Sequence, residues 1–244
     1  MDRASWTYYI LLGLSLLYPL AQSFEKRVYM YRKLRFILPG ILVIGAIYLI
    51  WDTWFTAAGI WGFNHNFTRD FYLLGLPLEE WLFFLVVPYS CIFLYEVLRY
   101  FVKRFYSPNF SRVIIYLLLL ILLGSIPFIL DRTYTLVTFS FTALMLVLQL
   151  VQKTYKTWFS GFLIAYIVSL VPFLVVNGIL TSLPVVWYNN AENLGVRVYT
   201  VPLDDFVYLM GLLLPSVNIY QVLLHRFASA QLRQKMDLDA VTGF

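Results

Sequence analysis

Two pairs of adjacent acidic residues are the strongest candidates for chemistry in this sequence. Residues 77–81 read Pro-Leu-Glu-Glu-Trp and residues 202–206 read Pro-Leu-Asp-Asp-Phe, so Glu79 and Glu80 recur as Asp204 and Asp205 after 125 residues. Proline and acids suit the first turn of a helix, which explains one acid in each pair. Adjacent helical residues project about 100° apart, so the second acid of each pair should face the aromatic residues nearby.

Carboxyl groups in such surroundings predict either acid–base chemistry or cation binding. Desolvation and a like-charged neighbour both favour a protonated carboxyl group, which can then serve as an acid near neutral pH. Four carboxyl groups that face one cavity could divide into an acid and a base. The same groups could instead bind a cation, as in a transporter or a channel. Asp52, which lies between two tryptophans, either caps its loop or joins the acids.

The elements that carry these acids are predicted to be membrane helices. Hydrophobic residues make up 61% of the 244 residues and charged residues 13%, which excludes a soluble globule and a disordered chain. A membrane helix needs about 20 mostly apolar residues. Seven runs qualify: residues 6–22, 34–51, 77–100, 113–130, 134–151, 159–181 and 203–224. We expect the first run to be a retained helix rather than a cleaved signal peptide.

The basic residues predict the orientation of these helices. Of the 18 lysines and arginines, 14 fall on one side of the seven spans and 4 on the other. The positive-inside rule then places the N-terminus outside and the C-terminus in the cytoplasm of a multi-pass cell-membrane protein. The formal net charge of +5 fits loops that face anionic lipid, and we expect no nucleic-acid partner.

The repeated acidic motif also predicts the domain organisation. Each motif follows two apolar runs and a long loop, and Tyr95 recurs as Tyr220 at the same spacing. We therefore expect a first three-helix repeat at residues 5–101, a linking helix at 113–130, a second repeat at 134–226 and a cytoplasmic tail at 228–244. Because one linking helix separates them, the repeats should run parallel and hold both acidic pairs at the same depth. The predicted fold is an all-α membrane protein of seven helices.

Several common catalytic sites are missing from the sequence. It has no G-x-G-x-x-G motif, no phosphate-binding P-loop and no D-D-x-x-D motif. The only cysteine is Cys91 and the only histidines are His65 and His225, so we expect no metal site. The remaining chemistry is acid–base chemistry without a cofactor, or transport.

The motifs together resemble the lycopene cyclase domain of the heterodimer-type bacterial and archaeal carotenoid cyclases. In the first half, residues 51–53 read Trp-Asp-Thr, residues 59–64 read Gly-Ile-Trp-Gly-Phe-Asn and residues 77–84 read Pro-Leu-Glu-Glu-Trp-Leu-Phe-Phe. In the second half, residues 186–189 read Val-Trp-Tyr-Asn, residues 193–195 read Asn-Leu-Gly and residues 218–220 read Asn-Ile-Tyr. The chain looks like the fused form of that family. It departs from the pattern at Gln221, where the first half has Glu96.

The resemblance implies conversion of lycopene to β-carotene through γ-carotene, without redox change and without a cofactor. An acid protonates C2 of the ψ-end, the C5–C6 double bond attacks the C1 cation, and the C5 cation loses a proton to a base. The catalytic residues implied are Glu79 or Glu80 as the acid, with Asp204 and Asp205 as counter-carboxylates or base. Residues expected to bind the carotenoid and exclude water from its cation are Asp52, Trp61, Phe63, Asn64, Trp81, Phe83, Phe84, Asn189 and Phe206.

Three other functions remain open at this point. A related carotenoid enzyme could form ε-rings, cyclise a longer carotenoid or hydrate the end group. A non-catalytic carotenoid-binding subunit is a second alternative. A small transporter is a third, and it is disfavoured because the runs between residues 113 and 181 carry few polar groups in mid-span. The expected partners are lycopene or a similar carotenoid and the lipid bilayer, whereas the sequence does not specify an oligomeric state.

Overall fold

The computed structural model describes residues 6–102 and 107–242, with side chains as far as Ser229. Residue 5, the expected beginning of the first repeat, and residues 243–244 at the end of the tail lie outside the described residues. So do Arg3, Lys103 and Arg104, which contribute to the charge asymmetry.

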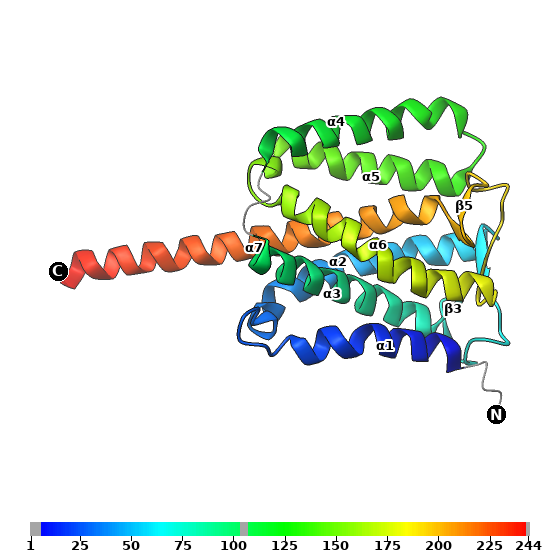
Figure 1. Ribbon diagram of the computed structural model, residues 1–244, viewed down its shortest axis with the longest axis horizontal. Coiled ribbons are helices and arrows are strands. Elements are labelled where there is room, and N and C mark those ends of the chain that lie inside the picture. The colour runs from blue at the N-terminus through cyan, green and yellow to red at the C-terminus, as the bar shows by residue number, and fades with distance from the viewer. Residues whose placement is uncertain (1–5, 103–106, 243–244) are drawn as a thin grey trace.

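The described chain consists of helices joined by loops with short strands (Figure 1). In order, the elements are α1 (Thr7–Gln22), α2 (Met30–Ala57), β1 (Trp61–Phe63), β2 (Tyr72–Leu73), β3 (Leu76–Pro77), α3 (Leu78–Phe101), α4 (Pro108–Ser125), the 3-10 turn η2 (Ile126–Phe128), α5 (Thr133–Val151), the 3-10 turn η3 (Thr154–Lys156), α6 (Phe159–Ser182), β4 (Val186–Tyr188), β5 (Arg197–Val198), β6 (Val201–Pro202) and α7 (Asp204–Thr242).

The helices confirm the all-α membrane fold. Among the described residues, the six helices from α2 to α7 are long and apolar enough to cross a membrane. Helix α1 has 16 residues, about 24 Å of helix, and packs along α3. The chain is therefore a multi-pass membrane protein.

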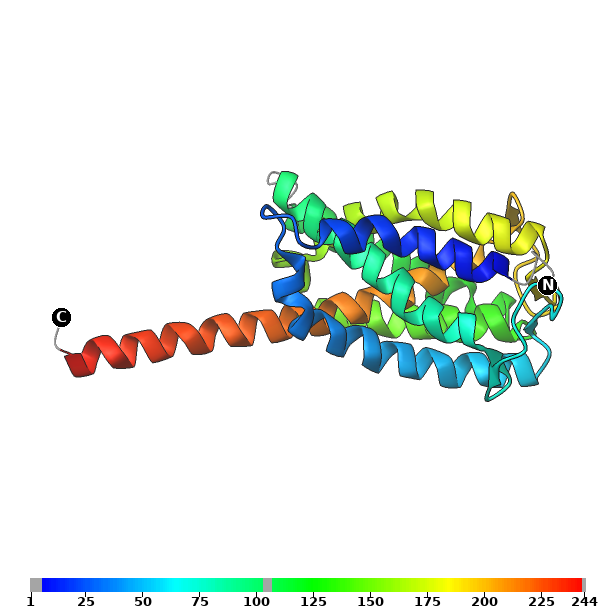
Figure 2. The same cartoon turned by 90° about the horizontal axis from the view of Figure 1, so that it is seen from below.

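Three helices depart by several residues from the predicted apolar runs. Helix α4, the linking helix, covers Pro108–Ser125 instead of residues 113–130, since Pro108 suits a first helical turn. Helix α2 begins at Met30 rather than at residue 34, because exposed basic side chains such as Arg32 can keep their charge in water while the backbone stays helical. Helix α7 continues to Thr242, so the segment predicted as a tail is helical over most of its length and extends beyond the bundle (Figure 2).

The two repeats pack into each other. Helix α1 packs on α3 and α5 on α7, which are equivalent pairs within the two repeats. Helix α2 of the first repeat packs along α7 of the second, and α6 packs along α3. The close approach of α2 and α7 depends on a small residue, since a Cβ atom on Gly40 would lie 2.5 Å from the backbone oxygen of Ser216.

Strands β1 and β4 join the two repeats at one end of the bundle. They pair antiparallel, with Trp61 opposite Tyr188, Phe63 opposite Val186, and Gly62 opposite Trp187 at the centre. If each residue is replaced by its equivalent in the other repeat, 125 residues away, the pair Trp61–Tyr188 becomes the pair Val186–Phe63. The central pair, Gly62 with Trp187, is replaced by itself. This register is that of a two-fold axis along the bundle, so the repeats are parallel and equivalent.

Equivalent hairpins lead into helices α3 and α7. Tyr72 pairs with Pro77 in the first hairpin and Arg197 pairs with Pro202 in the second. Both turns contain a left-handed residue at the same place, Leu74 with φ 54° and Tyr199 with φ 57°. Each hairpin ends in a proline that directly precedes the acidic first turn, and the two acidic pairs consequently lie at the same end of the bundle.

Candidate active site

One acid from each pair lines a shared cavity beneath the β1–β4 ribbon. Glu80 and Asp205 both face a cavity of about 50 Å³, and Asp52 from α2 lines it as well. The three side chains are 7%, 2% and 2% exposed, respectively. A cavity of this volume can hold water and has three carboxyl groups in its wall, so proton transfer inside it is chemically feasible.

The first-repeat side of the cavity has few hydrogen-bond donors for its acids. The hydroxyl of Tyr8 donates to Glu80 Oε2 at 2.6 Å. Asp52 Oδ2 is buried and has no hydrogen-bond partner in the described part of the chain. Trp61 also donates to the Asp52 carboxyl group. Two carboxyl groups with one side-chain donor each are difficult to hold ionised together, so this side of the cavity favours a proton on one of them.

The second-repeat side has three donors around a single acid. The hydroxyl of Tyr134 donates to Asp205 Oδ1 at 2.7 Å, and the hydroxyl of Tyr188 donates to Asp205 Oδ2 at 2.9 Å. The amide of Asn177 donates to Asp205 Oδ2 at 3.4 Å. Donors that converge on a carboxyl group favour its ionised form.

The asymmetry between the two sides arises at equivalent positions of the repeats. Asn177 occupies the position of Asp52, shifted by 125 residues, and Tyr188 occupies the position of Phe63. The first repeat therefore has an additional acid where the second has an amide. It also lacks the hydroxyl that the second repeat aims at its carboxyl group.

The other acid of each pair holds the preceding loop. The backbone N–H of Arg69 donates to Glu79 Oε1 at 2.9 Å, and the backbone N–H of Leu194 donates to Asp204 Oδ2 at 3.2 Å. Asp204 also accepts a hydrogen bond from Thr135. Neither Glu79 nor Asp204 lines the cavity, so their contacts are those of acids that anchor loops at helix starts.

Aromatic rings form much of the remaining wall. The ring centroids of Trp61 and Tyr134 are 4.9 Å apart, and those of Trp61 and Tyr208 are 5.8 Å apart. Tyr134 stacks on Tyr188 at 6.1 Å. Burial and the neighbouring Asp205 raise the pKa of Tyr188 well above its ordinary value, so its phenol remains a donor. Faces of such rings can stabilise a positive charge.

The sequence of this chain matches a known protein family in both repeats. The lycopene cyclase family model matches residues 5–98 and 131–223, which is more than half of the chain. The chain belongs to the lycopene cyclase family. No curated protein and no solved structure matches it. The two matched segments confirm the internal repeat, and helix α4 lies between them.

Some residues predicted to bind the substrate of this cyclase-family chain line the cavity. Besides Asp52, these are Trp61, Phe63 and Phe83. Phe84 does not line it but packs behind the wall against Tyr48, with ring centroids 5.9 Å apart.

The other predicted residues lie outside the cavity wall. The side-chain oxygens of Asn64 and Asn189 accept hydrogen bonds from backbone N–H groups two residues later, so both stabilise turns. Trp81 donates to the carbonyl oxygen of Leu73 at 3.3 Å, and the ring of Phe206 packs on Phe173.

Four polar residues that donate hydrogen bonds to the acids of this cavity were not among the predicted site residues: Tyr8, Tyr134, Asn177 and Tyr188. The repeat spacing carries a signal for two of them, because Asn177 and Tyr188 lie 125 residues after Asp52 and Phe63. Tyr8 and Tyr134 are themselves 126 residues apart, and both donate to the second acid of their own repeat.

A second, apolar cavity adjoins the first. It has a volume of about 260 Å³ and lies between helices α1, α3 and α6. Phe173 and Asn177, one helical turn apart on α6, line both cavities. Cys91 and Val87 of α3 and the exposed Tyr18 of α1 line its other walls. The described part of the chain contains no group of three or more His, Cys, Asp or Glu residues arranged to hold a metal ion.

Proposed function

We propose that this protein cyclises the ψ-ends of lycopene, or of a similar carotenoid, to β-rings. The observation that carries the proposal is the cavity in which Glu80 and Asp205 meet among aromatic rings, in a chain of the lycopene cyclase family. Cyclisation takes up a proton at C2 of the end group and releases one from C6, with a bond formed between C1 and C6. The reaction needs an acid, a base and protection of the cation, and it needs no redox cofactor.

In the proposed mechanism Glu80 is the proton donor. It shares the first-repeat side of the cavity with Asp52, which has an unpartnered oxygen, so one proton can be kept between them. Tyr8 fixes the orientation of Glu80 through its 2.6 Å hydrogen bond. Glu79 instead accepts a hydrogen bond from the backbone N–H of Arg69 and anchors the loop that precedes α3.

Asp205 is the proposed counter-carboxylate and base. Tyr134, Tyr188 and Asn177 hold it as an anion before the substrate is protonated. A preorganised negative charge stabilises the developing carbocation without rearrangement of the site. After ring closure the same carboxylate takes the proton from C6. Aromatic walls at Trp61 add stabilisation of the cation and restrict water, which would otherwise hydroxylate it.

The apolar cavity is the proposed site for the polyene chain. It shares Phe173 and Asn177 with the carboxylate cavity and has a mostly apolar wall, which fits a long hydrocarbon that enters from the bilayer. The carboxylate cavity of about 50 Å³ is too small for a complete end group, so the side chain of Phe173 must move as the end group enters.

The two-fold counterpart of this apolar cavity is filled. Tyr48 occupies the position equivalent to Phe173, and Ser216 occupies the position equivalent to Cys91; both are fully buried. The ring of Tyr48 packs on Tyr208 at 4.7 Å. One open side supports one reaction at a time, so the two ends of lycopene would be cyclised in separate binding events with a monocyclic intermediate.

The test is pigment analysis in lycopene-accumulating cells that express the chain. Wild-type protein should yield β-carotene, whereas Glu80→Gln and Asp205→Asn should leave lycopene. The matched controls are Glu79→Gln and Asp204→Asn, in which an amide oxygen can still accept the loop hydrogen bond, and these should retain cyclisation. Unchanged lycopene with wild-type protein present in the membrane would refute lycopene as the substrate, and an ε-ring or a hydrated end group would replace the β-ring assignment.

We further propose that the carboxylate end of the bundle faces outward and that the C-terminus is cytoplasmic. The opposite end carries basic side chains such as Lys33 and Arg99, as the positive-inside rule requires of a cytoplasmic face. A fluorescent protein that matures only in the cytoplasm, fused to the C-terminus, should fluoresce. A dark fusion present at normal levels would reverse the orientation.

A further inference from the structure

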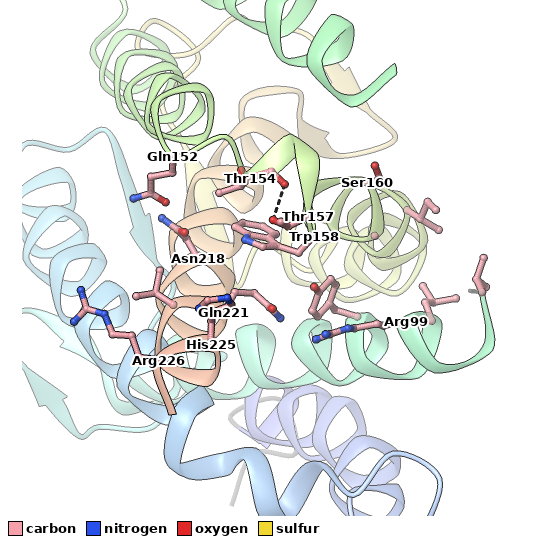
Figure 3. Close-up of a pocket in the computed structure, with 16 residues that line it drawn as sticks. Arg99, Gln152, Thr154, Thr157, Trp158, Ser160, Asn218, Gln221, His225 and Arg226 are labelled. Atoms are coloured by element: carbon pink, nitrogen blue, oxygen red, sulfur yellow. Dashed lines mark hydrogen bonds between the residues drawn. The ribbon is translucent and has the colours of Figure 1, made fainter. Parts of the chain in front are cut away.

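A large pocket with many polar side chains lies at the end of the bundle opposite the carboxylates. Figure 3 shows the side chains that line it. It has a volume of about 690 Å³ and lies between helices α3, α6 and α7 and the turn η3. Its described lining residues include Arg99, His225 and Arg226 and include no Asp or Glu. The pocket is thus biased toward positive charge, and the proposed cyclisation makes no use of it.

Two buried side chains that line this pocket have unpaired polar atoms. Gln221 is 9% exposed and its Nε2 has no hydrogen-bond partner among the described residues. Asn218, one turn earlier on α7, is 6% exposed and its Oδ1 is likewise unpartnered. Figure 3 shows both side chains beside the pocket, near Arg226. Buried unpaired polar atoms are rare. The donor Gln221 Nε2 calls for an acceptor, whereas the acceptor Asn218 Oδ1 calls for a donor such as a hydroxyl group.

The two-fold equivalent of Gln221 is an acid, although the cations that face this acid are not repeated, since Lys33 and Arg99 have Trp158 and Leu224 as their equivalents. That acid is Glu96, which forms an ion pair with Lys33 and accepts a hydrogen bond from Tyr220 at 2.8 Å. Arg99 reaches the same carboxylate at 3.6 Å. In the first repeat an acid of the chain therefore supplies the negative charge, whereas in the second repeat an uncharged amide stands in its place.

The depth of the pocket matches a lipid headgroup. From Glu79 to Arg99 helix α3 rises by about 30 Å, which is the thickness of the hydrocarbon core of a bilayer. Arg99 and Arg226 therefore lie where the phosphates of one leaflet lie. Arginine binds phosphate oxygens through paired N–H groups, and the amide nitrogen of Gln221 is a further donor.

We propose that this pocket binds the phosphate of an anionic phospholipid headgroup. The acyl chains would remain in the bilayer, and the headgroup would take the place that the carboxylate of Glu96 occupies in the first repeat. Free phosphate offers the same oxygens without the acyl chains, so the experiment compares the two sources. The proposal does not depend on the chemistry at Glu80 and Asp205.

The test is native mass spectrometry of the purified full chain with phosphatidylglycerol, phosphatidylcholine or inorganic phosphate. Wild-type protein should bind phosphatidylglycerol at least tenfold more tightly than either of the others. Gln221→Glu supplies an internal negative charge of nearly the same shape and should weaken this binding at least tenfold. Arg226→Gln should weaken it several-fold, whereas the control Arg112→Gln, an exposed arginine of α4 outside the pocket, should not.

Thermal unfolding of each variant in detergent separates loss of the site from loss of the fold. Equal binding of phosphatidylglycerol and phosphatidylcholine would overturn the proposal. So would unchanged phosphatidylglycerol binding in both folded variants. If inorganic phosphate bound as tightly as the lipid and was lost in Gln221→Glu, the site would belong to a soluble phosphate and the lipid assignment would be wrong.

Discussion

Replacing Tyr188 by phenylalanine removes one of the three donors to Asp205 and leaves the ring in place. The lost hydrogen bond is 2.9 Å long and ends on Asp205 Oδ2, whose other donor, Asn177, is 3.4 Å away. That oxygen would therefore keep only a weak hydrogen bond. The hydrogen bond from Tyr134 to the other oxygen, at 2.7 Å, would remain.

The size of the effect follows from the charge on Asp205. A hydrogen bond to a charged group contributes about 1.5–3 kcal/mol, which corresponds to roughly a 10- to 150-fold change in rate if it acts fully in the transition state. We expect kcat for lycopene cyclisation to fall about tenfold in Tyr188→Phe. This is the low end of that range, because the two other donors to Asp205 remain. The KM for lycopene should change little, since the stacking of the ring on Tyr134 is retained.

The assay is cyclisation of lycopene in detergent–lipid micelles, with products separated by chromatography and the melting temperature measured in parallel. The raised pKa of Tyr188 means that its phenol stays protonated up to and beyond about pH 10, the unperturbed value. The ratio of wild-type to Tyr188→Phe rates should therefore be constant between pH 7 and pH 9. A folded Tyr188→Phe protein whose kcat stays within twofold of wild type would refute the assignment of Asp205 as a held anion.

Three other changes test the site and the fold. Phe63→Tyr adds a hydroxyl group at the position equivalent to Tyr188. This hydroxyl should stabilise Glu80 as an anion and lower kcat about tenfold. An unchanged kcat would argue against Glu80 as the proton donor. Cys91→Trp should fill the apolar cavity and abolish binding of lycopene by the purified protein, measured as co-purified pigment, while Leu144→Trp on the exposed face of α5 should not; equal pigment in both would place the polyene elsewhere. Gly40→Ala should destabilise the α2–α7 contact by about 1–3 kcal/mol and lower the melting temperature. The control Gly13→Ala, which has nothing within 4 Å of the added Cβ, should not lower it. Equal melting temperatures of the two variants would contradict the close approach of α2 and α7.

The fold was largely predictable because membrane helices are encoded locally. Six of the seven apolar runs correspond to helices that are long enough to span, and the recurrence of Pro-Leu-acid-acid at residues 77–80 and 202–205 indicates the repeat. The β1–β4 ribbon was not predicted, because its pairs join residues such as Trp61 and Tyr188 that are far apart in sequence. Pairing of that kind depends on how the repeats pack, and three-residue strands carry little pattern of their own.

The site was predictable in outline but not in its division of labour. The sequence predicted all four acids as candidates alike, whereas only Glu80 and Asp205 of them line the cavity, and it could not separate Glu80 from Glu79. Their different surroundings depend on a tyrosine in α1 and on the loop backbone at Arg69. The donors around Asp205 come from α5, α6 and β4, and only tertiary packing brings these elements to one carboxyl group.

The departures from two-fold symmetry are where the proposed chemistry is concentrated. Two identical halves would place equal carboxyl groups opposite each other and give neither a preferred proton. Here Asp52 lies on the side of Glu80, whereas its equivalent Asn177 donates to Asp205. Phe63 has no hydroxyl, whereas its equivalent Tyr188 donates to Asp205. One side therefore has fewer donors than the other, and in the proposed mechanism this difference separates a proton donor from an anion within one cavity. The repeat supplies the scaffold, and in the proposed mechanism two differences between its copies give the acid and the base different roles.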